Sequence, residues 1–262
     1  MRNQGSCLAV LLLCLGVGIQ GCAKYSTPGG PADFRALGIS ADEANAMTDA
    51  SIAAVIDRKP AASFPASVAV VRLQDRNYSS YTVSNAYDVG KYSVVTIRDV
   101  EEETDFDSLS SLPHLRGIAP LNRLVVPNHV ASVKDLRLAA ARVQADFLLI
   151  YTFDTQFGTE KKVPALGTIT LGVFPSQQAR VTSTASAAFL DTRTGFIYGL
   201  AEATESADRM TNAWNSKEAV DKTRRAAERK AWESLVGELQ RTWVDIASTF
   251  GPPSIQAAST TP

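Results

Sequence analysis

Residues 185–199 read ASAAFLDTRTGFIYG, and this stretch decides the fold class. On both sides of DTRTG, small or apolar residues alternate with polar ones, and the alternation continues outward from Ala179 to Ala207. A period of two is typical of β-strands. A tight turn needs an acceptor such as Asp191 for backbone amides and a glycine such as Gly195 for a positive φ. The stretch therefore predicts a β-hairpin, and the turn accounts for the charged DTRTG segment without a binding site.

A strand and a helix are predicted just before the hairpin. The segment ADFLLIYTFDTQF, residues 145–157, is the most convincing further strand. It follows a predicted helix over residues 133–144, which is rich in Ala, Leu and Arg and has Ser132 as its N-cap candidate. A helix joined to a strand by so few residues is expected to pack on the sheet that the strand enters.

A long helix is predicted to close the domain. It spans residues 216–250, follows the N-cap candidate Asn215, and ends at Gly251-Pro252-Pro253. Its apolar stripe is predicted to cover the sheet. The stripe consists of Val220, Ala227, Trp232, Leu235, Leu239, Trp243 and Ile246.

The first half of the chain predicts the remaining elements. Residues 42–58 have mostly helical apolar spacing, which predicts an amphipathic helix, and residues 66–74 and 92–99 read as β-branched strands. The acidic run from Glu101 predicts a helix start, and IAPLNRLVVP, residues 118–127, predicts a short extended piece. The predicted fold class is α+β, with a mostly antiparallel sheet flanked by helices, in a single domain over residues 42–250.

The N-terminus looks like a bacterial lipoprotein signal. Residues 1–21 have a positive start and a short apolar run, and Ile19-Gln20-Gly21-Cys22 resembles the motif after which such signals are cleaved. The glycines of this run also fit G-x-G-x-x-G, but a dinucleotide loop needs a preceding strand, so that alternative fails. The resemblance implies fatty acyl chains, such as palmitate, on Cys22. Residues 22–41 are then a flexible tether, and residues 251–262 a disordered tail.

Composition excludes several function classes. The 26 Lys and Arg nearly balance the 27 Asp and Glu, so no overall charge recruits nucleic acid. The only cysteines are Cys7, Cys14 and Cys22, so the body of the chain can form no disulfide, cysteine-ligated zinc site or cysteine nucleophile. No nucleotide-binding or hydrolase motif occurs after the signal. We expect no cofactor, no metal and no enzyme activity.

Few residues remain as candidates for chemistry. His114 and His129 lie beside prolines without a second histidine nearby, and solvated loop positions account for them. The acidic cluster from Glu101 to Asp107 lacks the glycine and final glutamate of a calcium loop. A pair of glycosidase carboxylates, which could include Asp99 or Asp154 near strand ends, stays open as an alternative because such a pair can come from anywhere in a sequence.

Tyrosines are the best candidates for partner binding. Tyr78, Tyr81, Tyr87 and Tyr92 lie close together in a polar segment, and tyrosine is enriched at protein interfaces. The alternative is that one or two of these rings cap the edge of the core. Residues 163–175 are apolar and either form an internal strand or an exposed hairpin that meets another subunit or the membrane.

Several of these segments together resemble the rhombotarget lipoproteins, a bacterial family named for its genomic association with a rhomboid-type sorting protease. The resemblance rests on ADFLLIYTFDT, on the hairpin, on the closing helix AVDKTRRAAERKAWESLVGEL, and on GKYSVVTIRDVE and IAPLNRLVVP. A more distant likeness links the D-x-x-T-G turn to curli-secretion lipoproteins and to lipoprotein activators of penicillin-binding proteins. Some rhombotarget proteins end in a Gly-Gly motif, an apolar helix and a basic tail, whereas this chain ends in GPPSIQAASTTP.

The resemblance implies a lipoprotein of the outer membrane whose periplasmic domain binds another envelope protein as an assembly factor or activator. Because Ala23 rather than aspartate follows Cys22, the outer membrane is the expected destination. Two alternatives stay open: a ring-forming subunit of a secretion or surface-assembly apparatus, and a hydrolase of envelope glycans.

Overall fold

A computed structural model describes residues 48–75, 92–126, 130–161, 177–211 and 216–252. Four helices and six strands that are used below lie in these ranges. In chain order they are α3 (Asp49–Ile56), β1 (Ala66–Asp75), β2 (Tyr92–Val95), α4 (Glu103–Ser110), β3 (Leu115–Pro120), α5 (Val133–Arg142), β4 (Phe147–Lys161), β5 (Gln177–Asp191), β6 (Ile197–Thr211) and α7 (Ser216–Phe250), of which α7 is the longest helix.

The six strands form one sheet. Its order is β2-β1-β4-β5-β6, and β3 pairs with β1 beside this path. The predicted hairpin is confirmed as β5 and β6, and β4 pairs antiparallel with β5 along all of its 15 residues. The pairings of β1 with β3 and with β4 are parallel, which the sequence did not indicate. The predicted α+β class with a mostly antiparallel sheet is therefore confirmed, with a parallel centre added.

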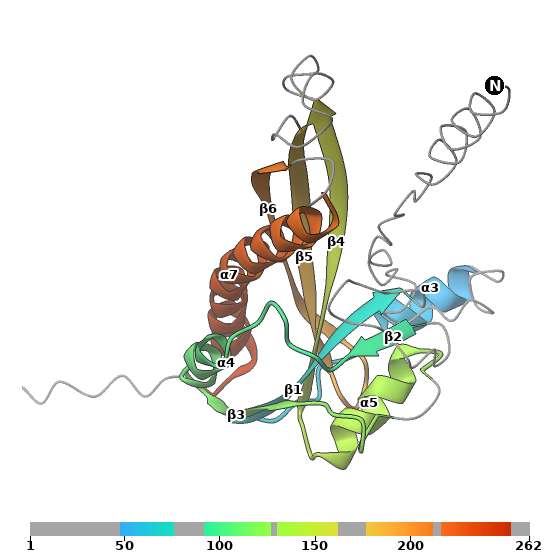
Figure 1. Ribbon diagram of the computed structural model, residues 1–262. Helices are drawn as coiled ribbons and strands as arrows, with labels where there is room; N and C mark the ends of the chain where they lie inside the picture. Colours follow the sequence, from blue (N-terminus) through green and yellow to red (C-terminus); the bar gives the residue numbers. More distant parts are fainter. Residues whose placement is uncertain (1–47, 76–91, 127–129, 162–176, 212–215, 253–262) are drawn as a thin grey trace, which may run out of the picture.

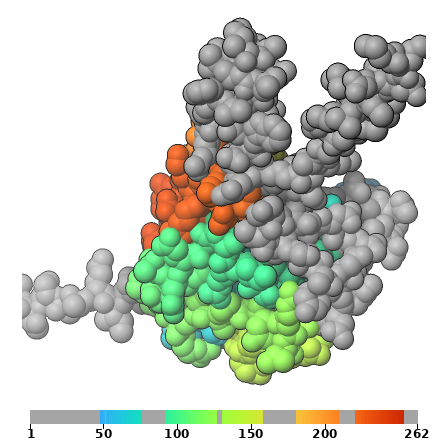
Figure 2. All heavy atoms as spheres, viewed as in Figure 1, coloured from blue at the N-terminus to red at the C-terminus, as the bar shows by residue number. Residues whose placement is uncertain are grey.

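Helix α7 covers one face of the sheet, which we call the inner face (Figure 1). It lies over β5 and β6, with α4 beside it, and the two helices form neighbouring parts of the surface in Figure 2. Trp232, Leu235 and Leu239 are fully buried against the sheet, and Trp243 and Ile246 nearly so. The predicted stripe is thus confirmed, apart from Val220, which is only half-buried.

Helix α5 covers part of the opposite face, which we call the outer face. Its buried residues Leu136, Ala139 and Ala140 share a core with Leu148 and Ile150 of β4. Its start at Ser132 is the predicted one, where the backbone N–H of Ser132 donates to Asp135 at 3.0 Å. Beyond α5 the outer face carries polar side chains of β4, β5 and β6.

Three expectations about the first half of the chain need correction. The helix predicted over residues 42–58 is present as α3 in the part that is described, from residue 48 on, but its Ile52, Val55 and Ile56 are 56%, 46% and 76% exposed, so it does not bury an apolar stripe in the domain core. Strand β2 ends at Val95 and not at the predicted residue 99, and Asp99 accepts from Arg224 of α7. The extended piece predicted over 118–127 ends early, since Asn122 Oδ1 accepts the N–H of Leu124 at 2.9 Å and forms a turn.

Several predictions fall outside the described residues. They concern the signal peptide, Cys22 and the tether, three of the four tyrosines (Tyr78, Tyr81 and Tyr87), His129, the apolar segment 163–175 and all but the first two residues of the tail. Within the part that is described, no helix is both long and apolar enough to cross a bilayer.

Candidate functional site

The described part of the chain holds six buried charged side chains between β1, the segment after β2, and the first half of α7. Each side chain is at most 9% exposed. We call this group the ionic cluster, and its members are Arg72, Asp99, Glu101, Asp221, Arg224 and Glu228.

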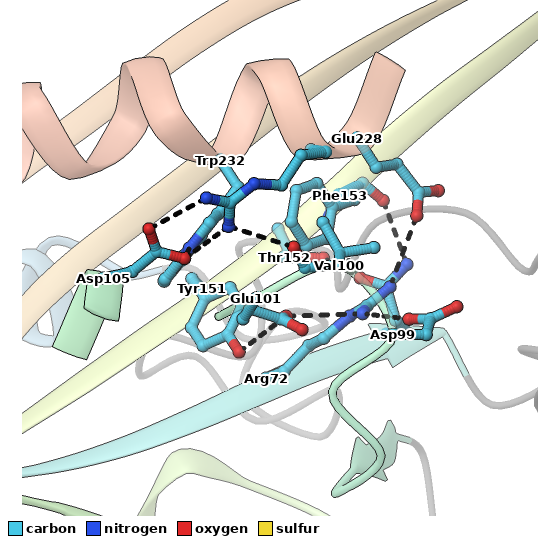
Figure 3. Close-up of polar contacts among 12 residues, drawn as sticks. Arg72, Asp99, Val100, Glu101, Asp105, Tyr151, Thr152, Phe153, Glu228 and Trp232 are labelled. Carbon is cyan, nitrogen blue, oxygen red and sulfur yellow. Dashed lines mark hydrogen bonds and ion pairs between the residues drawn. The ribbon is translucent and has the colours of Figure 1, made fainter. Parts of the chain in front are cut away.

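Arg72 enters the ionic cluster from the inner face of β1 (Figure 3). The strand places Val68, Val70 and Arg72 on the same side, because side chains two residues apart share a face. One guanidinium nitrogen lies 3.2 Å from Asp99 Oδ1 and 3.4 Å from Glu101 Oε1. The other lies 3.8 Å from Glu228 Oε2, and the guanidinium carbon lies 4.6 Å from the centre of the Phe153 ring. Arg72 therefore links the sheet to both α7 and the loop after β2.

Arg224 enters the ionic cluster from α7. Its Nη2 donates to Asp99 Oδ2 at 2.9 Å and its Nε to Asp221 Oδ1 at 3.2 Å. Its Nη1 donates to Glu228 one helical turn later. Asp99 thus accepts from two arginines, one on the sheet and one on the helix. Glu228 likewise lies beside both cations.

Two hydroxyl groups complete the ionic cluster. Tyr151 Oη donates to Glu101 Oε1 at 2.8 Å, and Thr155 Oγ1 donates to Glu228 Oε1 at 2.9 Å. Both hydroxyls come from inner-face positions of β4. Every carboxylate of the cluster contacts an arginine, and Glu101 and Glu228 also accept from these hydroxyls of β4.

Burial and charge oppose each other in the ionic cluster. Burial raises the pKa of Asp99, but the guanidinium groups of Arg72 and Arg224 outweigh this and hold the pKa below its ordinary value. For Glu228 burial prevails over the same two arginines and raises the pKa. Burial, followed by the charge of Glu101, raises the pKa of Tyr151 well above its ordinary value. Tyr151 is therefore held as a hydrogen-bond donor, and Asp99 as an anion.

Sequence reasoning missed most of the ionic cluster. It assigned Glu101 to a helix start, whereas the side chain is buried against Arg72 and Tyr151, since α4 begins two residues later. It also named Asp99 or Asp154 as possible glycosidase carboxylates; Asp99 contacts Arg224 of α7, while Asp154 lies on the outer face opposite Thr184. A signal was present in the arginine within the apolar run SVAVVRL, because an unpaired charge is costly in a buried strand.

The rest of the acidic run behaves as a helix start. Asp105 Oδ2 accepts the backbone N–H of Glu102 at 2.8 Å and the indole N–H of Trp232 at 2.9 Å. Arg229 of α7 also donates to Asp105. Burial raises the pKa of Asp105, but the bonds from Arg229, Glu102 and Trp232 lower it overall. The start of α4 is in this way fixed to α7.

The predicted DTRTG turn is confirmed, and Asp191 in it also binds the segment before β1. Asp191 Oδ1 accepts the N–H groups of Arg193 and Thr194 at 2.8 and 2.9 Å, and Gly195 has a φ of 73°. Asp191 Oδ2 accepts from the N–H of Ala61 at 2.6 Å and from the Tyr198 hydroxyl at 3.0 Å. Asp191 therefore ties the segment before β1 to the hairpin, which no local pattern indicates.

The structure places two other predicted residues. Tyr92 begins β2 opposite Asp75 and packs half-buried against the outer-face core. This fits the alternative that one or two of the tyrosines cap the edge of the core. His114 lies in the turn before β3, where its carbonyl oxygen accepts the N–H of Ala66 at 2.8 Å. Among the residues that the structure describes, no three His, Cys, Asp or Glu side chains are arranged to hold a metal ion.

The solved structures that resemble this chain include distant matches to bacterial proteins. No family model matches the sequence, and no curated protein sequence matches it significantly. A DUF330-family protein from Xanthomonas campestris is 12% identical over 73% of this chain and 94% of its own, with a TM-score of 0.34. A lipoprotein from Neisseria meningitidis is 14% identical over 71% of this chain and 99% of its own, with a TM-score of 0.27. Scores this low assign no family, so the resemblance to rhombotarget lipoproteins stays a prediction.

Proposed function

We propose that this protein is a lipid-anchored lipoprotein of the bacterial outer membrane, facing the periplasm, whose domain binds another envelope protein without catalysis. The observation that carries the proposal is the sequence Ile19-Gln20-Gly21-Cys22 at the end of a short apolar run. Two or three acyl chains on Cys22 would hold the protein stably, whereas one chain holds a protein only marginally.

The ionic cluster supports a structural rather than a catalytic role for the inner face. Its carboxylates contact arginines of the same domain, and its side chains are buried between α7 and the sheet. General acid–base work needs a carboxyl group within reach of a substrate. The cluster is instead suited to fix α7 on the sheet, which leaves binding to surfaces elsewhere on the domain.

The outer face offers such a surface. Beyond α5 it carries a set of polar side chains that we call the outer polar face, made of Asp154, Gln156, Thr182, Thr184, Glu202, Thr204 and Ser206. Gln156, Glu202, Thr204 and Ser206 are exposed, and neighbouring hydroxyls bond across the strands, as in the 2.8 Å Thr184–Thr204 pair. This ordered polar surface, together with the tyrosine segment 78–92, is the partner contact that we propose.

The anchor is tested by Cys22→Ser expressed from its own signal in a Gram-negative host. We expect wild-type protein in the outer-membrane fraction with an acylated N-terminal peptide by mass spectrometry, and Cys22→Ser without acylation and without stable membrane attachment. Cys14→Ser, which changes a thiol inside the apolar run, is the matched control and should behave as wild type. Acylation-free wild-type protein would refute the anchor.

Partner binding is tested by a photo-crosslinking phenylalanine derivative placed at Gln156 in the anchored protein. We expect one dominant adduct with an envelope protein after irradiation of intact cells. The control position is Val244, which is 47% exposed on α7, away from the outer face. Absence of an adduct at Gln156, or the same products from both positions, would contradict the proposed surface.

A further inference from the structure

Strand β6 ends the sheet with a long open edge. It has 15 residues and pairs with β5 along one side, and within the described ranges the strand order stops there. The free side of an edge strand presents a row of backbone N–H and C=O groups that can pair with another strand. This edge is much longer than an ordinary strand, which has about 5 or 6 residues.

The side-chain pairs show which residues of β6 present these groups. Hydroxyl pairs join Thr184 to Thr204 and Thr182 to Ser206, each at 2.8 Å. Side chains come closest at the positions of an antiparallel ladder that exchange no backbone hydrogen bonds. At Thr204, Ser206 and Glu202 the backbone groups therefore point away from β5. In agreement, the carbonyl oxygen of Ser206 accepts from Lys230 Nζ of α7 at 3.3 Å.

We propose that two copies of this protein associate by antiparallel pairing of their β6 edges about a two-fold axis at Thr204. Thr204 is the central residue of Ile197–Thr211, so this register pairs the whole of each strand. With a two-fold axis both copies contribute the same surface, so the assembly is a closed dimer. The two sheets then form one continuous sheet, and neither β6 edge stays open.

The side chains of β6 fit this register. Thr204 meets Thr204 of the second copy, and Glu202 meets Ser206. The same two kinds of contact already join β5 to β6, where Ser186 Oγ donates to Glu202 at 2.8 Å and Thr184 pairs with Thr204. A shift of the axis to Glu202 would instead place two carboxylates directly opposite each other, which is destabilising.

The flank of α7 above the edge leaves room for the second copy. Lys230 and Ser234 of α7 contact Ser206 and Glu205 of β6, and Gly237 continues the same helical stripe. A Cβ added at Gly237 would meet no atom within 4 Å. The small side chains of Ser234 and Gly237 allow the α7 helices of the two copies to lie side by side when the two sheets join.

Disulfide trapping in membranes tests the register. Thr204→Cys places two thiols at paired positions with Cα atoms about 5.5 Å apart, within disulfide reach. Ser206→Cys is the control, because its two copies would lie about 14 Å apart along the strands. Under mild oxidation we expect covalent dimers of Thr204→Cys and none of Ser206→Cys, while a mixture of Glu202→Cys with Ser206→Cys should link. The wild-type chain is the background, since its cysteines all lie in the first 22 residues.

A second measurement asks whether the edge is needed for association. In detergent, light scattering should give twice the chain mass for wild type and a single mass for Thr204→Lys, which sets two cations opposite each other. Leu138→Lys introduces the same charge at a position of α5 that is 53% exposed and lies outside the outer polar face and the edge, and it should keep the doubled mass. The proposal is overturned if wild-type protein is a monomer in detergent and Thr204→Cys forms no covalent dimer in membranes. Equal trapping at positions 204 and 206 overturns it as well.

Discussion

Replacing Arg224 with methionine is expected to lower the free energy of unfolding by about 4 kcal/mol, the range typical of breaking a buried ion pair. Arg224 is fully buried and donates to Asp99, Asp221 and Glu228. Methionine fills much of the same volume but leaves three carboxylates with one cation fewer. The measurement is the urea midpoint of the purified full-length chain, followed by circular dichroism.

The matched control is Arg241→Met on the same helix. Arg241 is 70% exposed and forms a surface ion pair with Glu238. Exposed pairs contribute little, so this change should cost under about 1 kcal/mol. Adding Glu228→Gln to Arg224→Met should recover part of the loss, because one uncompensated charge is removed. An Arg224→Met variant as stable as the Arg241→Met variant would refute the role given to the ionic cluster.

Replacing Trp243 with alanine is the second large effect that we expect, with a loss of about 3 to 5 kcal/mol. Its ring centre lies 5.2 Å from that of Phe147, 5.6 Å from Phe189 and 6.0 Å from Phe64. Its indole N–H also donates to the carbonyl oxygen of Pro113 at 2.9 Å. Alanine would leave a cavity among β4, β5 and the segment before β1, and the carbonyl oxygen of Pro113 would lose the hydrogen bond from the indole.

Val244→Ala is the control for Trp243→Ala. Val244 is 47% exposed, so its replacement should lower the free energy of unfolding by under about 0.5 kcal/mol. Trp243→Phe should fall between the two, since it keeps an aromatic ring but loses the hydrogen bond. Thermal unfolding of the three variants gives the order directly. Equal stability of Trp243→Ala and Val244→Ala would contradict the packing described for α7.

Both large effects concern the attachment of α7, and they act at different points of the helix. Arg224 links its first half to β1 through Asp99, and Trp243 packs its second half on β4 and β5. Asp105 holds the middle through Trp232 and Arg229. Lys230 and Ser234 of the same helix contact β6, so α7 lies beside the edge that we propose to pair.

Local patterns predicted much of the fold because their causes are local. The hairpin follows from alternation and from the turn chemistry of Asp191 and Gly195, and the buried face of α7 follows from its helical spacing. For α3 the same reasoning gave the helix but no buried face, because periodicity says which face is apolar but not what it contacts. Of the candidate site, the sequence indicated Asp99 and Glu101, but with other roles.

The sequence by itself determined the hairpin, the long closing helix, the absence of cysteine chemistry in the domain and the pattern on which the proposed anchor rests. Each depends on residues a few positions apart, within reach of one turn or one strand period. Only the tertiary structure decided that Arg72 and Arg224 share Asp99, that β1 lies parallel to β4, and that β6 is the last strand of the sheet among the residues that the structure describes. Arg224 and Asp99 are 125 residues apart. Contacts over such distances depend on how the elements pack, and no local spacing in the sequence encodes them.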